Sequence, residues 1–105
     1  MAASIKVVDG SGQQTTDLTV THTYDFTVTV RYTSSNGPAQ VQCVCVYGNK
    51  TETFSLNVAQ AATATDVDVD CTPDSDDEEV TLSAHLVDGN GHELCGPWTG
   101  VKVHT

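Results

Sequence analysis

Residues 24–33 read YDFTVTVRYT, and apolar and polar side chains alternate along this stretch. One face of an extended chain would carry the apolar residues Tyr24, Phe26, Val28, Val30 and Tyr32. The opposite face would carry an aspartate, three threonines and an arginine. Side chains point alternately to the two faces of a β-strand, so this pattern predicts an antiparallel strand with one buried face.

The same alternation recurs along the chain, in segments separated by turn residues. These segments cover residues 4–8, 17–23, 40–48, 51–58, 66–71, 79–87 and 92–105. Residues 59–65 are expected to form a connection, and DGNG at 88–91 predicts a two-residue hairpin. Seven or eight short strands at this spacing are typical of an antiparallel β-sandwich.

We therefore expect an all-β fold with a single domain over residues 1–105, and residues 1–8 as an N-terminal arm or edge strand. The 38 % share of apolar residues is sufficient for a thin two-layer protein. The expected core residues are Phe26, Val28, Val30, Val69, Leu82 and Leu86.

The charge is strongly acidic: 14 acidic residues against 4 basic ones give a formal net charge of −10. A negative field repels phosphate backbones and anionic lipid heads, which argues against nucleic-acid and membrane partners. It favours solubility and docking onto basic protein surfaces. The sequence also has neither a signal peptide nor an apolar run of the roughly 18 residues that cross a bilayer.

The four cysteines are Cys43, Cys45, Cys71 and Cys95. Cys43 and Cys45 lie two apart on a predicted strand, so they share a face but run parallel and do not bridge each other. Zinc motifs generally use C-x2-C on a turn, which this strand lacks. We expect two disulfides, with Cys71 bound to Cys43 or Cys45 and Cys95 to the other; buried free thiols are the alternative.

The stretch DVDVDCTPDSDDEE at 66–79 concentrates the negative charge. Asp74, Asp76 and Asp77 fall in its loop and could supply oxygen ligands to a weak calcium site, although the EF-hand glycine and glutamate are missing. The alternative is a solvated strand face and loop. No other cofactor is expected.

No catalytic residues are expected. Ser83 and His85 share a strand face, but no nucleophile elbow or oxyanion loop accompanies them. Trp98 follows Gly96-Pro97 and either caps the core or serves as an exposed anchor for a partner.

The order of FTVTVRYTSSNGPA, VQCVCVYG, ETFSLNVAQAATATDVDVDC and EVTLSAHLVDGNGHEL resembles CARDB and fibronectin-type-III-like modules of the immunoglobulin-like class. The resemblance covers residues 17–95. It departs from those modules at Cys71, where an aromatic residue is often found, and in the paired cysteines. It implies an antiparallel immunoglobulin-like β-sandwich of seven to eight strands that serves as a binding or structural module, and it carries over no catalytic residue.

Two functions are consistent with this sequence. The first is a non-enzymatic decoration or accessory subunit on the outside of a virion, made in the host cytoplasm and bound to a capsid or tail protein of a tailed phage. Docking would then use residues 1–8, including Ile5 and Val7, or Trp98. Homo-oligomerisation of the subunit is an open alternative. The alternative is an adhesion or carbohydrate-binding module of a bacterial surface or secreted protein.

Overall fold

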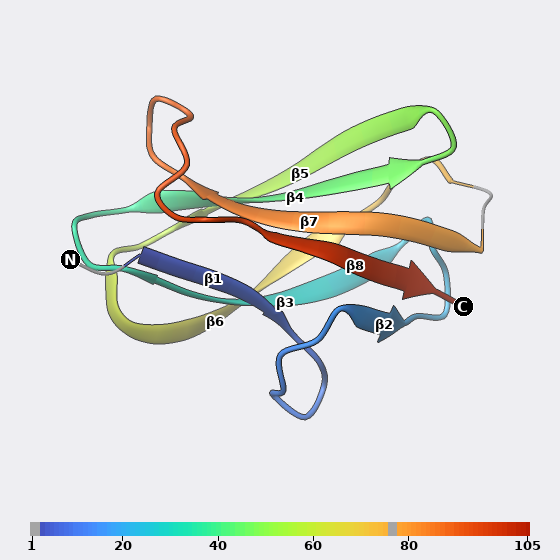
Figure 1. Ribbon diagram of the computed structural model, residues 1–105, viewed down its shortest axis with the longest axis horizontal. Coiled ribbons are helices and arrows are strands. Elements are labelled where there is room, and N and C mark those ends of the chain that lie inside the picture. The colour runs from blue at the N-terminus through green and yellow to red at the C-terminus, as the bar shows by residue number, and fades with distance from the viewer. Residues whose placement is uncertain (1–2, 76–77) are drawn as a thin grey trace.

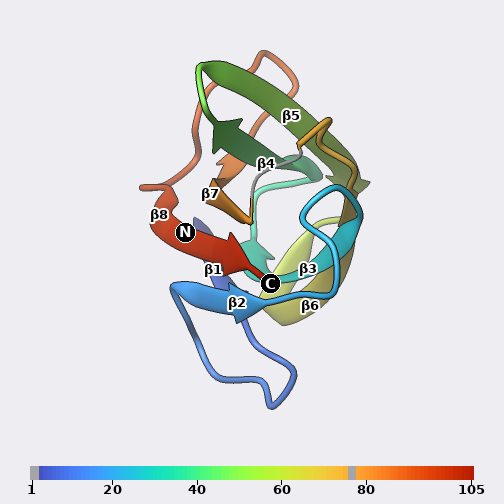
Figure 2. The ribbon, with the colours of Figure 1, turned by 90° about the vertical axis from the view of Figure 1, so that its right-hand side faces the viewer.

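The structure is a computed structural model and describes residues 3–75 and 78–105. The regular secondary structure of this part of the chain consists of β-strands, and the strands form two facing sheets (Figures 1 and 2). The strands are β1 (Ala3–Val8), β2 (Asp17–Thr19), β3 (Phe26–Ser34), β4 (Ala39–Tyr47), β5 (Lys50–Val58), β6 (Ala61–Cys71), β7 (Glu79–Val87) and β8 (Trp98–His104). The prediction of an all-β fold with two sheets is confirmed.

The smaller sheet has the order β1-β3-β6, and the larger sheet has the order β2-β8-β7-β4-β5. Pairings between the described strands are antiparallel except that β2 runs parallel to β8. β3 is the central strand of the smaller sheet, with Val30 opposite Val7 on β1 and opposite Val67 on β6. Its strict alternation is explained by this position, since one face packs on the core and the other meets solvent.

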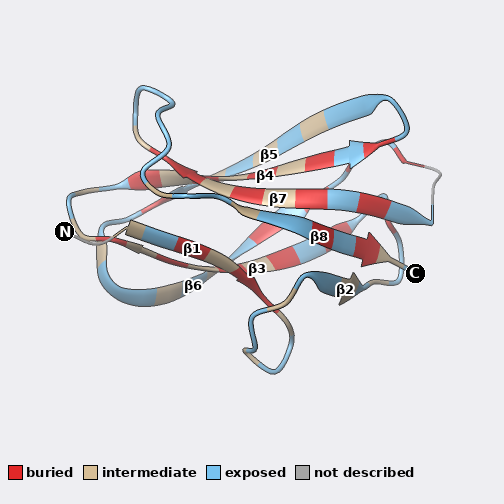
Figure 3. Cartoon of the chain, viewed as in Figure 1, coloured by how far each residue is buried: buried red, intermediate tan, exposed pale blue. Residues whose placement is uncertain are grey.

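The core lies between the sheets, and buried residues alternate with exposed ones along the strands that enclose it (Figure 3). Val28, Val30, Leu82 and Leu86 are completely buried, and Phe26 and Val69 are 6 % and 2 % exposed. All six predicted core residues are therefore confirmed. Burying a side chain of this size contributes about 1.5–3 kcal/mol, so the β-branched residues of the central strands supply much of the stability.

The first residue of the opening stretch departs from the prediction. Tyr24 is 53 % exposed, and β3 begins only at Phe26. Residues 21–25 form a turn in which the Asp25 amide donates to the carbonyl of His22, and the Tyr24 ring stacks on the His22 ring. The turn rotates Tyr24 away from the core, which the alternation alone could not reveal.

Three connections also differ from the prediction. β6 begins at Ala61, so the connection from β5 is only residues 59–60. The two-residue hairpin lies at Gly48-Asn49 between β4 and β5, where Gly48 adopts a φ of 57°. DGNG instead starts the longer connection from β7 to β8, and of residues 17–23 only Asp17–Thr19 form a strand.

Candidate functional site

Three cysteines meet between the two sheets. Cys43 and Cys45 point inward from β4 in the larger sheet, and Cys71 ends β6 in the smaller one. All three side chains are fully buried. The strand period places Cys43 and Cys45 on one inward face, as predicted, and the packing of the sheets brings Cys71 against them.

All four cysteines are free thiols in the structure. The pKa of Cys45 is raised, first by a hydrogen bond with the Cys71 thiol and then by burial. The pKa of Cys71 is also raised, chiefly by its hydrogen bond with Cys43. Burial, followed by the charge of Glu93, raises the pKa of Cys95. Cys71 therefore has both of its predicted partners within reach, whereas the cluster does not include Cys95.

Oxidised protein is expected to contain one internal disulfide, from Cys71 to Cys43 or Cys45, instead of the two predicted from the sequence. Closing a loop of roughly 26 to 28 residues would add about 3–4 kcal/mol to the free energy of unfolding. Mass spectrometry after alkylation in denaturant should count two free thiols. The Cys71→Ala variant should form no bridge and serves as the control. Four alkylated thiols after oxidation would contradict the prediction.

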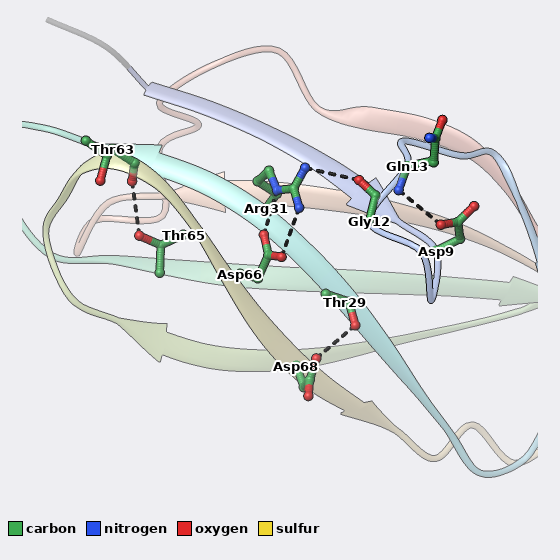
Figure 4. A network of polar contacts seen from close by, with 9 residues as sticks. All are labelled: Asp9, Gly12, Gln13, Thr29, Arg31, Thr63, Thr65, Asp66 and Asp68. Carbon is green, nitrogen blue, oxygen red and sulfur yellow. Dashed lines mark hydrogen bonds and ion pairs between the residues drawn. The ribbon is translucent and has the colours of Figure 1, made fainter.

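The acidic strand face is internally paired. Asp66, Asp68 and Asp70 point outward from β6 beside residues of β3. Arg31 contacts both carboxylate oxygens of Asp66, at 2.7 and 3.0 Å, and the Thr29 hydroxyl donates to Asp68 at 2.9 Å (Figure 4). The hydrogen bond from Arg31 lowers the pKa of Asp66. Each carboxylate thus has a partner on the neighbouring strand, since Thr27 donates to Asp70 in the same way.

The acidic loop is described only in part. Asp74 is exposed, and its backbone amide donates to Glu52 at 2.8 Å. Glu52 also accepts from the Tyr47 hydroxyl at 2.6 Å, and this bond raises the pKa of Tyr47 to about 12. Asp76 and Asp77 lie outside the described residues. Within residues 3–75 and 78–105 no group of three or more His, Cys, Asp or Glu side chains could hold a metal ion, and the calcium site stays a prediction.

The three predicted partner contacts lie in the folded domain as follows. Ile5 and Val7 are 7 % and 0 % exposed, because both side chains point from β1 into the core. A partner cannot reach them while the domain is folded, so the prediction is corrected. Trp98 is half-buried against the core, and its indole N–H donates to the Thr15 carbonyl at 2.9 Å. This position corresponds to the core-capping alternative.

The strand edges differ in how they are protected. Part of the β1 edge is covered, since the Thr15 amide donates to the Val7 carbonyl. β6 is an edge strand lined by its three outward aspartates, and charged side chains on an edge discourage pairing with another chain. β5 is also an edge strand, nine residues long. The strand begins at the exposed Lys50, and its outward positions after that residue carry neutral polar side chains, those of Thr51, Thr53, Ser55 and Asn57.

Two of the hollows lined by described residues lie at opposite ends of the sandwich. The larger, of about 550 Å³, includes Gln40, Asn57 and Asp88 in its lining. The smaller, of about 240 Å³, is lined by Thr21, His22, Thr23, Tyr24, Ser75, Glu78 and Thr105. In the smaller hollow the exposed Tyr24 ring stacks on His22 with their centroids 4.7 Å apart. An exposed aromatic ring among polar groups is a feature of ligand sites.

Three hydrogen-bonded polar side chains lie on the outer face of β7, those of Ser83, His85 and Glu93. The sequence pattern predicts only the first two of them to lie together. Ser83 and His85 share this face, as the strand period indicates. Their side chains are hydrogen-bonded, and Glu93 contacts the other nitrogen of His85. Glu93 follows a turn and returns beside β7 through a bridge to Val87. The sequence signal for that return is the turn-forming DGNG, which by itself predicts a shorter hairpin.

Comparisons with known proteins identify no relative, so a function can be argued only from the sequence and the fold. No family model matches the chain, and searches of curated proteins and of solved structures find no significant match. Among the described residues, no helix has the length and apolar character needed to cross a membrane.

Proposed function

We propose that this chain is a structural protein, an immunoglobulin-like accessory subunit on the outside of a tailed-phage capsid or tail. In this role it is made in the host cytoplasm and binds a protein of the virion surface. Its contribution to the particle is mechanical and requires no cofactor.

The strand order supports the immunoglobulin-like part of the proposal. If β1, β3 and β6 are taken as strands A, B and E, the larger sheet has the order G-F-C-C′ from β8 to β5. That arrangement is the one expected of an immunoglobulin-like sandwich with an added C′ strand. β2 follows β1 in the chain and pairs with β8, so it forms one edge of the larger sheet.

The observation that carries the proposal is the open β5 edge. β5 is paired with β4 along its whole length, but its other side faces no described strand. Its outward side chains after Lys50 are neutral, whereas β6 is lined by aspartates. A strand of a partner protein can add to such an edge through main-chain hydrogen bonds. The acidic face of the smaller sheet would then point away from the shell and keep the particle surface soluble.

Lysines on the β5 edge should prevent assembly. The test is co-sedimentation with shells of a phage that encodes this chain, assembled without it. We expect wild type to bind and the Thr53→Lys/Ser55→Lys variant to remain in the supernatant, because outward lysines on an edge oppose strand addition. Ala62→Lys/Ala64→Lys on β6 adds the same charge at the other edge and should still bind. Binding lost only in the β6 variant would reverse the docking edge, and shells that bind no wild type would refute the virion role.

The smaller hollow favours the second candidate, a carbohydrate-binding adhesion module. Tyr24 offers an exposed ring for stacking, and Glu78 with the threonines offers polar groups around it. Binding of wild type to a glycan array, lost in Tyr24→Ala, would favour this function over the virion role.

A further inference from the structure

We propose that Ser83, His85 and Glu93 form an acyl-transfer site on the outer face of the larger sheet, with Ser83 as the nucleophile toward small uncharged esters. This inference is independent of the structural role proposed above. It departs from the expectation that the chain has no catalytic residues.

The three side chains are arranged in the order nucleophile, imidazole, carboxylate. Ser83 Oγ lies 2.8 Å from Nε2 of His85, and Nδ1 of His85 lies 2.5 Å from Oε1 of Glu93. Each ring nitrogen therefore has one partner. This arrangement is recognised by its geometry and roles, on whatever fold it occurs.

Backbone contacts, and not only the contact with His85, hold Glu93 in place. The turn after β7 is closed by the Gly91 amide, which donates to the Asp88 carbonyl at 3.1 Å. The returning chain is then fixed where the Leu94 amide donates to the Leu86 carbonyl at 2.8 Å. Glu93 is thereby held beside β7 before any substrate arrives, and an arrangement formed in advance is what general-base activation requires.

The carboxylate determines where the imidazole carries its proton. An ionised Glu93 can only accept hydrogen bonds. The neutral His85 ring therefore carries its proton on Nδ1, and this N–H donates a hydrogen bond to Glu93. Nε2 is then the acceptor for the Ser83 hydroxyl. His85 is thus in the tautomer that can take the Ser83 proton as a general base.

The reaction that follows is balanced within this set of residues. Ser83 Oγ bonds to the ester carbonyl carbon as its proton moves to Nε2 of His85, and Glu93 stabilises the imidazolium. The bond from the carbonyl carbon to the leaving oxygen then breaks, and that oxygen takes the proton from His85. Water, activated by His85 in the same way, releases the acid and restores Ser83.

Lys102 is placed to stabilise the negative charge that develops on the carbonyl oxygen. It lies opposite Thr81, two residues from Ser83, and points to the same exposed face from β8. The register between β7 and β8 shifts between Leu82 and Ala84, beside Ser83. In a regular ladder diagonal neighbours are roughly 7–8 Å apart, which is within reach of a lysine side chain. No ion pair joins Lys102 to another described residue, so its charge is available to a bound substrate.

The position of the site limits its substrates. His85 is 23 % exposed and Ser83 is partly buried, on an open sheet face. The net charge of −10 disfavours anionic substrates. Small neutral esters with good leaving groups fit these conditions.

A fluorophosphonate probe tests the nucleophile directly in the full-length protein. The Ser83 Oγ–phosphorus bond forms, fluoride leaves, and the serine proton passes through His85 to solvent. Intact mass should show a single adduct, which peptide mapping places on Ser83. Because general-base assistance contributes about 100-fold or more, urea-unfolded protein should react at least about 100-fold more slowly.

Variants separate the roles of the three residues. Ser83→Ala should give no adduct, and His85→Gln should lower the labelling rate about 100-fold. Glu93 is a positioning residue, so Glu93→Gln should slow labelling roughly tenfold or more while Glu93→Asp restores part of the rate. Thr81→Ala, on the same face of β7, is the matched control and should label like wild type. Circular dichroism verifies that each variant is folded.

The proposal is overturned if folded wild type gives no adduct, or if the adduct maps to a residue other than Ser83. It is also overturned if folded and unfolded protein react at the same rate. Equal labelling of wild type and Glu93→Gln would remove Glu93 from the site.

Discussion

Val28→Asp is expected to unfold the domain. Val28 has no exposed surface and lies in the middle of β3, opposite Val69 on β6. An unpaired carboxylate at this position would lose its hydration without gaining a partner, at a cost of several kcal/mol. Because small domains are stable by only about 5–15 kcal/mol, this single change removes much or all of the stability. Urea unfolding followed by far-UV circular dichroism measures the effect.

Val46→Asp is the matched control for this substitution. Val46 lies on β4, points outward and is 42 % exposed. The new charge stays in water there, so the free energy of unfolding should change by about 0.5 kcal/mol or less. If both variants unfolded at the same urea concentration, the assignment of Val28 to a dry core would be wrong.

Deleting residues 1–8 is expected to abolish cooperative folding. The deletion removes β1, whose side chains Ile5, Val7 and Val8 are all buried. Each contributes about 1.5–3 kcal/mol, and together roughly 5–9 kcal/mol, comparable with the whole stability of a small domain. The loss also exposes one edge of β3. Thermal unfolding by circular dichroism and amide dispersion in NMR spectra provide the measurement.

The Ser4→Ala variant controls for changes confined to the surface of β1. Ser4 is exposed and its hydroxyl bonds to that of Thr33 at 2.7 Å, so its replacement should lower the melting temperature only slightly. A truncated protein with native amide dispersion would show instead that residues 1–8 are a dispensable arm. The sequence alone is consistent with such an arm, but the burial of Ile5 and Val7 argues against it.

Much of the fold could be predicted because strand periodicity is local. Alternation assigned the inward and outward faces of β3, β4 and β7, and it named six core residues that are all buried. It did less well at the ends of strands. Tyr24 continues the alternation but leaves the core because a turn precedes β3, and a turn is determined by hydrogen bonds that alternation does not encode.

Strand periodicity also predicted part of each candidate site. The sequence placed Cys43 and Cys45 on one inward face and Ser83 and His85 on one outward face, since residues two apart on a strand share a face.

The sequence by itself thus determined which side chains face inward and which face outward, because that choice depends only on the two-residue period of an extended chain. The tertiary structure decided which of them meet. Cys71 reaches Cys43 and Cys45 only because the two sheets pack face to face, and Glu93 reaches His85 only because the chain after β7 folds back. The reason is that such contacts depend on the packing of one sheet on another and on the path of a loop, which periodicity along one strand does not specify.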